Sequence, residues 1–108
     1  MSFKVFLTKD AEADLNDIYT HISEHDSADK AEYVLDEIER KFASLSELPE
    51  RGVYPRELVD LGIRDYREIF FKPYRIIYRV SQKRVYVYLI ADGRRDMQSF
   101  LQRRLLRA

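Results

Sequence analysis

The sequence of 108 residues lacks cysteine and tryptophan, and it contains only three glycines and three prolines. Without cysteine, neither a disulfide bond nor a thiolate metal site can form. The three glycines stand far apart, which excludes a glycine-rich phosphate-binding loop. No run approaches the roughly 20 apolar residues that span a bilayer. Residues 1–20 lack the pattern of a signal peptide, so we expect a cytoplasmic protein with no membrane partner.

Histidine is also scarce, since His21 and His25 are the only two. Their spacing of four residues places both on one face of a helix, where a metal ion could bridge them. The sequence offers no clear third ligand, and solvated histidines on helices are far more common. We therefore predict no metal and no other cofactor. A serine–histidine–aspartate pattern for nucleophilic catalysis is not evident either.

The net charge of zero conceals a strong asymmetry between the two halves. Residues 1–48 carry 5 lysines and arginines against 12 carboxylates, a net charge of −7. Residues 49–108 carry 14 against 7, a net charge of +7, and 12 of those 14 cations are arginine. The planar guanidinium suits phosphate and carboxylate groups. This pattern indicates a basic working surface that meets nucleic acid or an acidic protein, unless the two halves only neutralise each other within the fold.

Hydrophobic periodicity predicts a strand followed by two helices in the first half. Residues 3–7 alternate as in a short strand. Apolar residues recur at helical spacing over about 8–25 and again over about 27–45, and each segment begins with residues that can cap a helix. Because only a short link separates them, we expect an antiparallel helical hairpin. Residues 49–62 hold two prolines and two glycines, which predicts a loop with room for one helical turn.

The second half changes to a period of two. Residues 66–71, 74–80 and 84–91 are rich in isoleucine, valine, tyrosine and phenylalanine, which predicts three strands. Their short connections require antiparallel neighbours, and residues 94–107 are predicted to form a terminal helix. The order β-α-α-β-β-β-α indicates an α+β fold: a small, mainly antiparallel sheet with the N-terminal helical hairpin packed on one face. We expect a single domain over residues 1–108.

Strand parity predicts which side chains lie on the face of the sheet that the hairpin leaves open. In the last strand, Val85, Val87 and Leu89 are predicted to form the apolar row. If such rows pack on the helices, the open face presents arginines and tyrosines, with two more arginines at its rim: Arg75, Arg79, Tyr86, Tyr88, Arg94 and Arg95. Arginine beside tyrosine can hold phosphates and stack on bases, or it can anchor a protein partner. An ordinary solvated antiparallel face is the alternative.

Three sequence segments resemble a known family. They are Gly62 to Val80 (GIRDYREIFFKPYRIIYRV), Arg84 to Asp96 (RVYVYLIADGRRD) and the opening helix TKDAEADL. Together and in this order they resemble the RelE/ParE superfamily, whose members are toxins of type II toxin–antitoxin systems. That family shows a strand with tyrosine and arginine before two aliphatic residues and a tyrosine, then an aliphatic strand, then a basic element after glycine. The resemblance covers essentially the whole chain and implies a toxin that a cognate antitoxin, encoded by the adjacent gene, neutralises.

The superfamily contains two activities on one fold. RelE-like members cleave messenger RNA in the ribosome without a metal, and ParE-like members inhibit DNA gyrase. By resemblance, Arg75 and Arg95 match arginines of the ribonucleases and would be catalytic only in that case. The paired lysines of the ribonucleases are missing from residues 66–70, and Phe100 and Leu101 stand where a terminal tyrosine is expected. We therefore favour a ParE-like inhibitor that acts by binding, with a ribosome-dependent ribonuclease and a decayed toxin that only binds antitoxin as alternatives.

Glu68 is the one remaining candidate for a general base, and Arg75→Ala is expected to leave the fold intact. The resemblance implies that an amphipathic, often acidic antitoxin segment docks in a groove or adds a strand. Our candidates for binding the target or the antitoxin come from the basic half, although the apolar ones can equally be core residues. They are Arg67, Arg79, Tyr86, Tyr88, Arg94, Met97, Phe100 and Leu101.

Overall fold

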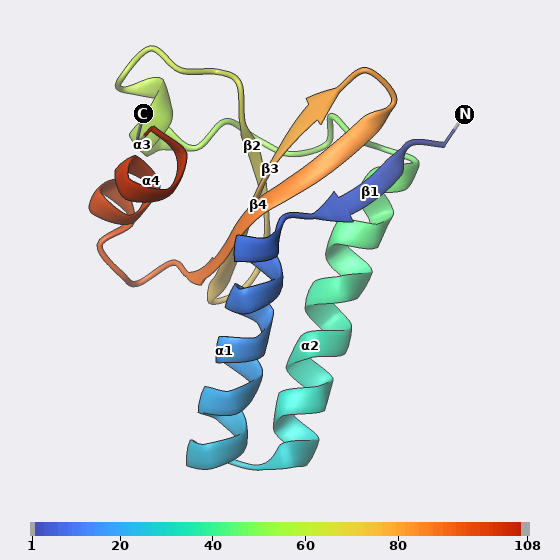
Figure 1. Ribbon diagram of the computed structural model, residues 1–108, viewed down its shortest axis with the longest axis vertical. Coiled ribbons are helices and arrows are strands. Elements are labelled where there is room, and N and C mark those ends of the chain that lie inside the picture. The colour runs from blue at the N-terminus through green and yellow to red at the C-terminus, as the bar shows by residue number, and fades with distance from the viewer. Residues whose placement is uncertain (1, 107–108) are drawn as a thin grey trace.

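The computed structural model describes residues 2–106 and confirms the predicted order of helices and strands (Figure 1). The predicted loop contains one short helix, α3, and a single 3-10 turn, η1, extends the second helix. The elements are β1 (Lys4–Leu7), α1 (Lys9–His25), α2 (Ala28–Ala43), η1 (Ser44–Ser46), α3 (Arg56–Val59), β2 (Arg67–Phe71), β3 (Tyr74–Ser81), β4 (Arg84–Asp92) and α4 (Met97–Leu105).

Side-chain caps fix where three helices begin. Thr8, Ser27 and Asp96 precede α1, α2 and α4, and each accepts a hydrogen bond from the main-chain N–H three residues later. Because Asp96 caps α4, that helix begins at Met97. The sequence had predicted a start at residue 94. The predicted last residue of this helix, 107, lies outside the described residues.

The four strands form one mixed sheet in the order β1-β4-β3-β2. β3 pairs antiparallel with both β4 and β2, whereas β1 pairs parallel with β4 and sets Val5 beside Val85. α1 and α2 lie side by side and pack against one face of the sheet (Figure 1). The prediction of a helical hairpin on one face is therefore confirmed. The parallel partner of β1 is a long-range feature that periodicity cannot reveal.

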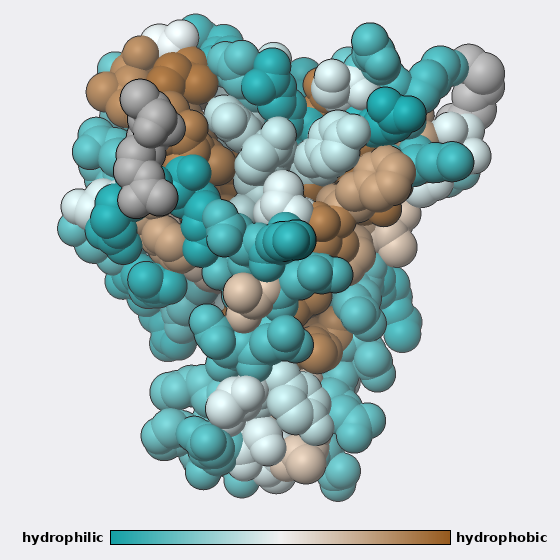
Figure 2. All heavy atoms as spheres, in the orientation of Figure 1, coloured by the Kyte–Doolittle hydropathy of each residue, from teal (hydrophilic) through white to brown (hydrophobic). Residues whose placement is uncertain are grey.

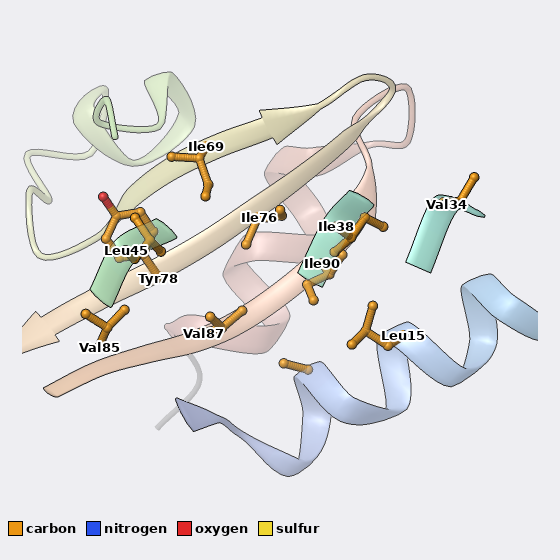
Figure 3. Packing of buried hydrophobic residues seen from close by; sticks show 11 residues of the cluster. Leu15, Val34, Ile38, Leu45, Ile69, Ile76, Tyr78, Val85, Val87 and Ile90 are labelled. Carbon is orange, nitrogen blue, oxygen red and sulfur yellow. The ribbon is translucent and has the colours of Figure 1, made fainter. Parts of the chain in front are cut away.

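The first core lies between the hairpin and the sheet (Figure 3). Tyr78 is its largest fully buried side chain, and its hydroxyl accepts a 3.0 Å hydrogen bond from the N–H of Gly52. A Cβ on Gly52 would lie 2.7 Å from the carbonyl oxygen of Glu68, so glycine lets the loop before α3 approach β2. The buried members of this core are Ala11, Leu15, Val34, Ile38, Leu45, Ile69, Ile76, Tyr78, Val85, Val87 and Ile90.

A second core covers half of the opposite face, because α3 and α4 pack there (Figure 1). It contains Leu58, Tyr66, Ile77, Leu89, Ala91, Met97, Phe100 and Leu101. The prediction that the hairpin leaves this whole face open is therefore wrong: α3 and α4 cover part of it, and the part beside β1 stays exposed. No helix within residues 2–106 is long and apolar enough to cross a membrane.

A β-bulge in β4 decides which residues face which core. Ile77 pairs with Leu89 and Tyr78 pairs with Val87, so Tyr88 is an extra residue without a partner across the ladder. Beyond this residue the facing of the strand reverses. Val87 packs in the first core and Leu89 in the second. The prediction that they share one apolar row is wrong, because a strict period of two takes no account of an inserted residue.

Candidate functional site

The exposed half of the second sheet face carries a group of side chains that we call the aromatic–basic patch: Lys4, Phe6, Arg79, Arg84 and Tyr86. The strand register sets Phe6, Tyr86 and Arg79 in one row across β1, β4 and β3, and Lys4 and Arg84 in the next row. The rings of Phe6 and Tyr86 stack with centroids 5.5 Å apart. Phe6 is 40% exposed and the Arg79 side chain 45%. This face therefore offers an aromatic platform with cations around it.

Tyr88 lies at the border between the patch and the second core. Its ring meets the edge of the Tyr66 ring at a centroid distance of 5.5 Å, and it is partly buried. Arg79 has one weak carboxylate neighbour, Asp65, at 3.8 Å. Of the residues predicted from the sequence, the structure thus brings together Arg79 and Tyr86, with Tyr88 at their edge. It adds Phe6, which sequence reasoning missed because nothing local indicates that β1 lies beside β4.

Arg75 lies on the same face of the sheet but under α3, where two carboxylates hold it. Its Nε donates to Glu68 at 2.7 Å, and its two terminal nitrogens donate to the two carboxylate oxygens of Glu57 at 2.8 and 2.9 Å. The Arg75 side chain is only 13% exposed. Gly93 packs so closely against this side chain that a Cβ on Gly93 would lie 2.7 Å from the Cδ of Arg75. The guanidinium is therefore occupied by protein carboxylates rather than presented to a ligand.

The electrostatics of this cluster are unequal for the two carboxylates. The hydrogen bonds from Arg75 lower the pKa of Glu57. Burial raises the pKa of Glu68, although its hydrogen bond to Arg75 opposes that rise. Both carboxylates in turn raise the pKa of Arg75. One cation thus faces two carboxylates in a partly buried site, and its hydrogen bond to Glu68 opposes the effect of burial on the pKa of that carboxyl.

The other predicted arginines lie in separate places. Arg67 donates to the carbonyl oxygen of Gly52 at 2.9 Å and to the hydroxyl of Tyr54 at 3.1 Å, so it ties the loop before α3 to β2. Arg94 pairs with Asp92 at 2.6 Å and its side chain is 78% exposed. Arg95 lies 4.0 Å over the ring of Phe100 and lines a cleft of about 310 Å³ between α1 and the end of β4.

The three apolar residues predicted as a receiving surface on α4 lie inside the second core. Met97 is 4% exposed, Phe100 7% and Leu101 0%. While α4 is docked on the sheet, these side chains contact the protein's own interior. Their helical spacing is accounted for by core packing, the alternative that the sequence left open.

A second ion pair, which was not predicted from the sequence, joins α1 and α4. Arg104 donates to both carboxylate oxygens of Asp14 at 3.0 Å and to the carbonyl oxygen of Tyr88 at 3.0 Å. Asp14 also accepts from the N–H of Ile90 at 2.9 Å. The two side chains thus satisfy main-chain groups of β4 beyond the end of β1. The one signal in the sequence that could have indicated this ion pair was the position of Asp14, a carboxylate beside the apolar stripe of its helix that includes Ala11 and Leu15.

The hairpin carries an apolar furrow that sequence analysis also missed. Four apolar side chains line it, those of Leu7, Leu15, Leu35 and Phe42, and its volume is about 560 Å³. The exposed polar residues Glu12, Asn16 and Glu39 stand at its rim. Figure 2 shows the apolar atoms between α1, α2 and β1. We call these seven residues the hairpin furrow. Within residues 2–106, no three histidine, aspartate or glutamate side chains are placed to hold a metal ion.

Solved structures of toxins share this architecture. The chromosomal ParDE system of P. aeruginosa matches with a TM-score of 0.71 at 22% identity, covering 84% of this chain and 96% of that chain. A mutant of the E. coli toxin RelE in the free state matches with a TM-score of 0.62 at 15% identity, covering 93% of both chains. The RelBE2 complex of Mycobacterium tuberculosis matches with a TM-score of 0.58 at 21% identity, covering 85% and 92%. These likenesses establish the fold.

Sequence comparison distinguishes the two branches of this fold. Toxin ParE3 of Caulobacter vibrioides is 29% identical over 100 residues, which cover 91% of this chain and 94% of that toxin. The family model described as the ParE toxin of the type II toxin–antitoxin system parDE matches residues 5–97. Since that match spans most of the sequence, the chain belongs to the ParE family and is the toxin of a type II toxin–antitoxin system.

Proposed function

We propose that this toxin inhibits DNA gyrase by binding, with the aromatic–basic patch as its contact surface, and that it does not cleave RNA. The observation that carries the proposal is the occupied guanidinium of Arg75. By resemblance, a ribonuclease would use this arginine at the scissile phosphate. Here Glu57 and Glu68 take its donors. A phosphate would have to displace both carboxylates from a guanidinium that already donates to them.

The candidates for acid and base chemistry support the same proposal. Glu68 is 5% exposed and hydrogen-bonded to Arg75, so it has no free access to a substrate hydroxyl. His21 and His25 lie on α1, which packs on the opposite face of the sheet. Neither group can meet a substrate bound on the aromatic–basic patch. Binding to the target remains as the mode of action that these positions allow.

Pulse labelling after tightly controlled induction separates the two targets. Thymidine and methionine incorporation would be followed during the first minutes in a bacterial host. We expect thymidine incorporation to fall first while translation continues, because gyrase inhibition stops replication. An immediate collapse of methionine incorporation would contradict the proposal and favour the ribosome-dependent ribonuclease. Unaffected growth and labelling would favour a decayed toxin that only binds its antitoxin.

Substitutions in the aromatic–basic patch are expected to reduce toxicity. The double substitution Arg79→Glu and Tyr86→Ala should weaken target binding by about thirtyfold or more, because it reverses a surface charge and removes an aromatic anchor. The induced toxin should then no longer arrest growth at expression levels at which the wild type does. Both side chains are at least partly exposed, so the variant should remain folded. Arg40→Glu is the matched control, because this α2 side chain is 77% exposed and far from the patch in the fold.

We also propose that the antitoxin docks in the hairpin furrow. β1 is an edge strand, and the N–H groups of Lys4 and Thr8 point toward β4. Those of Val5 and Leu7 therefore point outward, next to the furrow. An extended antitoxin segment could pair with this edge and place apolar side chains on Leu35 and Phe42. The carboxylates at the rim favour a segment with basic flanks, and they disfavour a second copy of this acidic hairpin.

Co-purification tests this docking site against the basic surface at Arg94 and Arg95, just before α4. Leu35→Asp places a charge in the furrow and should abolish capture of the antitoxin, with an affinity loss of about a hundredfold or more. The double substitution Arg94→Glu and Arg95→Glu, which tests the surface predicted from the sequence, should leave capture intact. The opposite pattern would move the antitoxin to the basic surface. Circular dichroism on both variants would confirm that they are folded.

A further inference from the structure

We infer that the aromatic–basic patch binds single-stranded nucleic acid, with bases stacked on Phe6 and Tyr86 and phosphates held by Lys4, Arg79 and Arg84. The inference extends the proposed function, since it assigns to the same face a nucleic-acid strand in addition to the gyrase protein. It rests on the chemistry of the exposed side chains and on their placement by three neighbouring strands.

The aromatic part of the patch provides a flat surface for bases. Phe6 and Tyr86 stack on each other with an interplanar angle of 22°, so an unpaired base can extend this stack over an exposed ring face. Phe6 is 40% exposed although it stands in the middle of a strand. Its ring is therefore accessible to a ligand on the side that Tyr86 does not cover. Base stacking on such rings tolerates any sequence, because every base has a flat face.

The cations stand around this platform on two sides. Arg79 continues the row of Phe6 and Tyr86 on β3, and Lys4 and Arg84 form the adjacent row. Two rows are about 6.6 Å apart along the strands, since each residue rises about 3.3 Å. The side chains of Lys4, Arg79 and Arg84 are exposed and long enough to reach outward from the sheet. A strand that crosses the platform would therefore place its phosphates near a cation on either side of the stacked bases.

A shallow pocket at the end of β1 adds to this charge. It has a volume of about 330 Å³ and is lined by Ser2, Lys4, Gln82, Lys83 and Arg84. Its lining includes Lys4 and Arg84, the two cations of the second row of the patch, and no carboxylate. The one carboxylate paired with a patch cation within residues 2–106 is Asp65, at 3.8 Å from Arg79. The pocket thus continues the patch as a site for a phosphate group.

The shape of the surface favours a single strand over a duplex. The patch lies on the face of a sheet, where rings can contact the flat side of an unpaired base. In a duplex those sides are stacked inside the helix, and only the cations would find a partner. An acidic protein segment would use the cations as well, but it would not need an exposed pair of stacked rings. The combination of stacked rings and cations therefore points to unpaired bases with a phosphate backbone.

Fluorescence anisotropy with the full-length toxin and labelled 15-nucleotide oligothymidine tests the inference. We expect saturable binding that weakens about twentyfold from 50 to 200 mM salt, as three phosphate contacts predict. Tyr86→Ala should weaken binding about tenfold or more, and Tyr86→Phe should retain it. Arg84→Glu should abolish it, whereas Arg40→Glu, with the same charge change on α2, should have no effect. An oligouridine of equal length shows whether the strand is DNA or RNA, and tighter binding of either supports the inference.

Three results would overturn it: no binding at low salt, equal or tighter binding of a duplex, or equal losses from Arg84→Glu and Arg40→Glu. The last result would mean that charge alone attracts the oligonucleotide. Gyrase is absent from this assay, so the outcome does not depend on the proposed target. A toxin that inhibits supercoiling but binds no oligonucleotide would retain the proposed function and lose this inference. A toxin that binds the oligonucleotide and does not inhibit gyrase would support this inference and contradict the proposed function.

Discussion

Arg75→Ala is expected to lower the free energy of unfolding by about 3 kcal/mol, as is typical when one partner of a buried ion pair is removed. The substitution leaves Glu57 and Glu68 side by side without the guanidinium that separates them. The Glu68 side chain is 6% exposed, so the substitution leaves a poorly solvated carboxylate without its hydrogen-bond donor. Sequence analysis expected this variant to fold normally, and the structure replaces that expectation. Urea unfolding measures the loss directly.

The same variant should depend on pH in a distinctive way. In the wild type, the lowered pKa of Glu57 adds stability above its ordinary value of 4.5, and this stability is lost as the pH falls. Without Arg75, burial and mutual repulsion raise both carboxyl pKa values. The folded variant then binds more protons than the unfolded chain, so its stability falls as the pH rises through this range. We therefore expect a smaller stability deficit at about pH 4 than at pH 7.

Arg79→Ala is the control for this experiment. It removes another arginine of β3 that lies on the same face of the sheet. The Arg79 side chain is 45% exposed, and its ion pair with Asp65 is long, at 3.8 Å. Its expected effect is below about 0.5 kcal/mol. If Arg75→Ala were equally mild at pH 7, the guanidinium would not be holding the two carboxylates. Arg75 would then have to be reconsidered as a group free to meet a phosphate.

Arg104→Ala is the second substitution with a large expected effect, about 2–4 kcal/mol. It removes both guanidinium bonds to Asp14, whose side chain is 10% exposed, and the bond to the Tyr88 carbonyl oxygen. α4 also loses its direct tie to α1 and β4. Hydrogen exchange offers a residue-level measurement, because the N–H of Ile90 donates to the same carboxylate. We expect faster exchange there and along α4 before global unfolding.

Arg103→Ala provides the comparison for this second prediction. Arg103 neighbours Arg104 on α4, is exposed, and lies 5.6 Å from the Phe100 ring. We expect it to cost less than about 1 kcal/mol. Equal losses from the two variants would show that α4 depends on its arginines only through Phe100. In that case the ion pair with Asp14 would not be what fastens the helix.

Local features of the sequence were sufficient for much of the fold. The helical stripe and the caps Thr8 and Ser27 locate the hairpin, because both depend on residues within one or two turns of each other. The short links fix the antiparallel strands in the same way. The parallel pairing of β1 with β4, the bulge at Tyr88 and the packing of α3 and α4 join segments that are far apart in sequence. No periodicity within a single element encodes them.

The same division applies to the candidate site. Parity correctly placed Arg75 and Arg79 on the face opposite the hairpin, because β3 has no bulged residue of its own. Parity could not indicate that Glu57, which lies in α3, would reach Arg75. Nor could it bring Phe6 beside Tyr86, since that contact depends on the sheet order. The sequence therefore identified residue types that suit a binding surface. Only the tertiary structure distinguished Arg75, which is held by carboxylates, from Arg79, which is exposed.

The most direct test of the central claim is a supercoiling assay with purified gyrase, relaxed plasmid and ATP. We predict that the purified toxin stops supercoiling at concentrations close to that of gyrase, and that the Arg79→Glu, Tyr86→Ala double variant does not. A parallel reaction with translating ribosomes should leave the messenger RNA intact. Undisturbed supercoiling together with cleaved messenger RNA would contradict the account and return Arg75 and Arg95 to the role of catalytic residues.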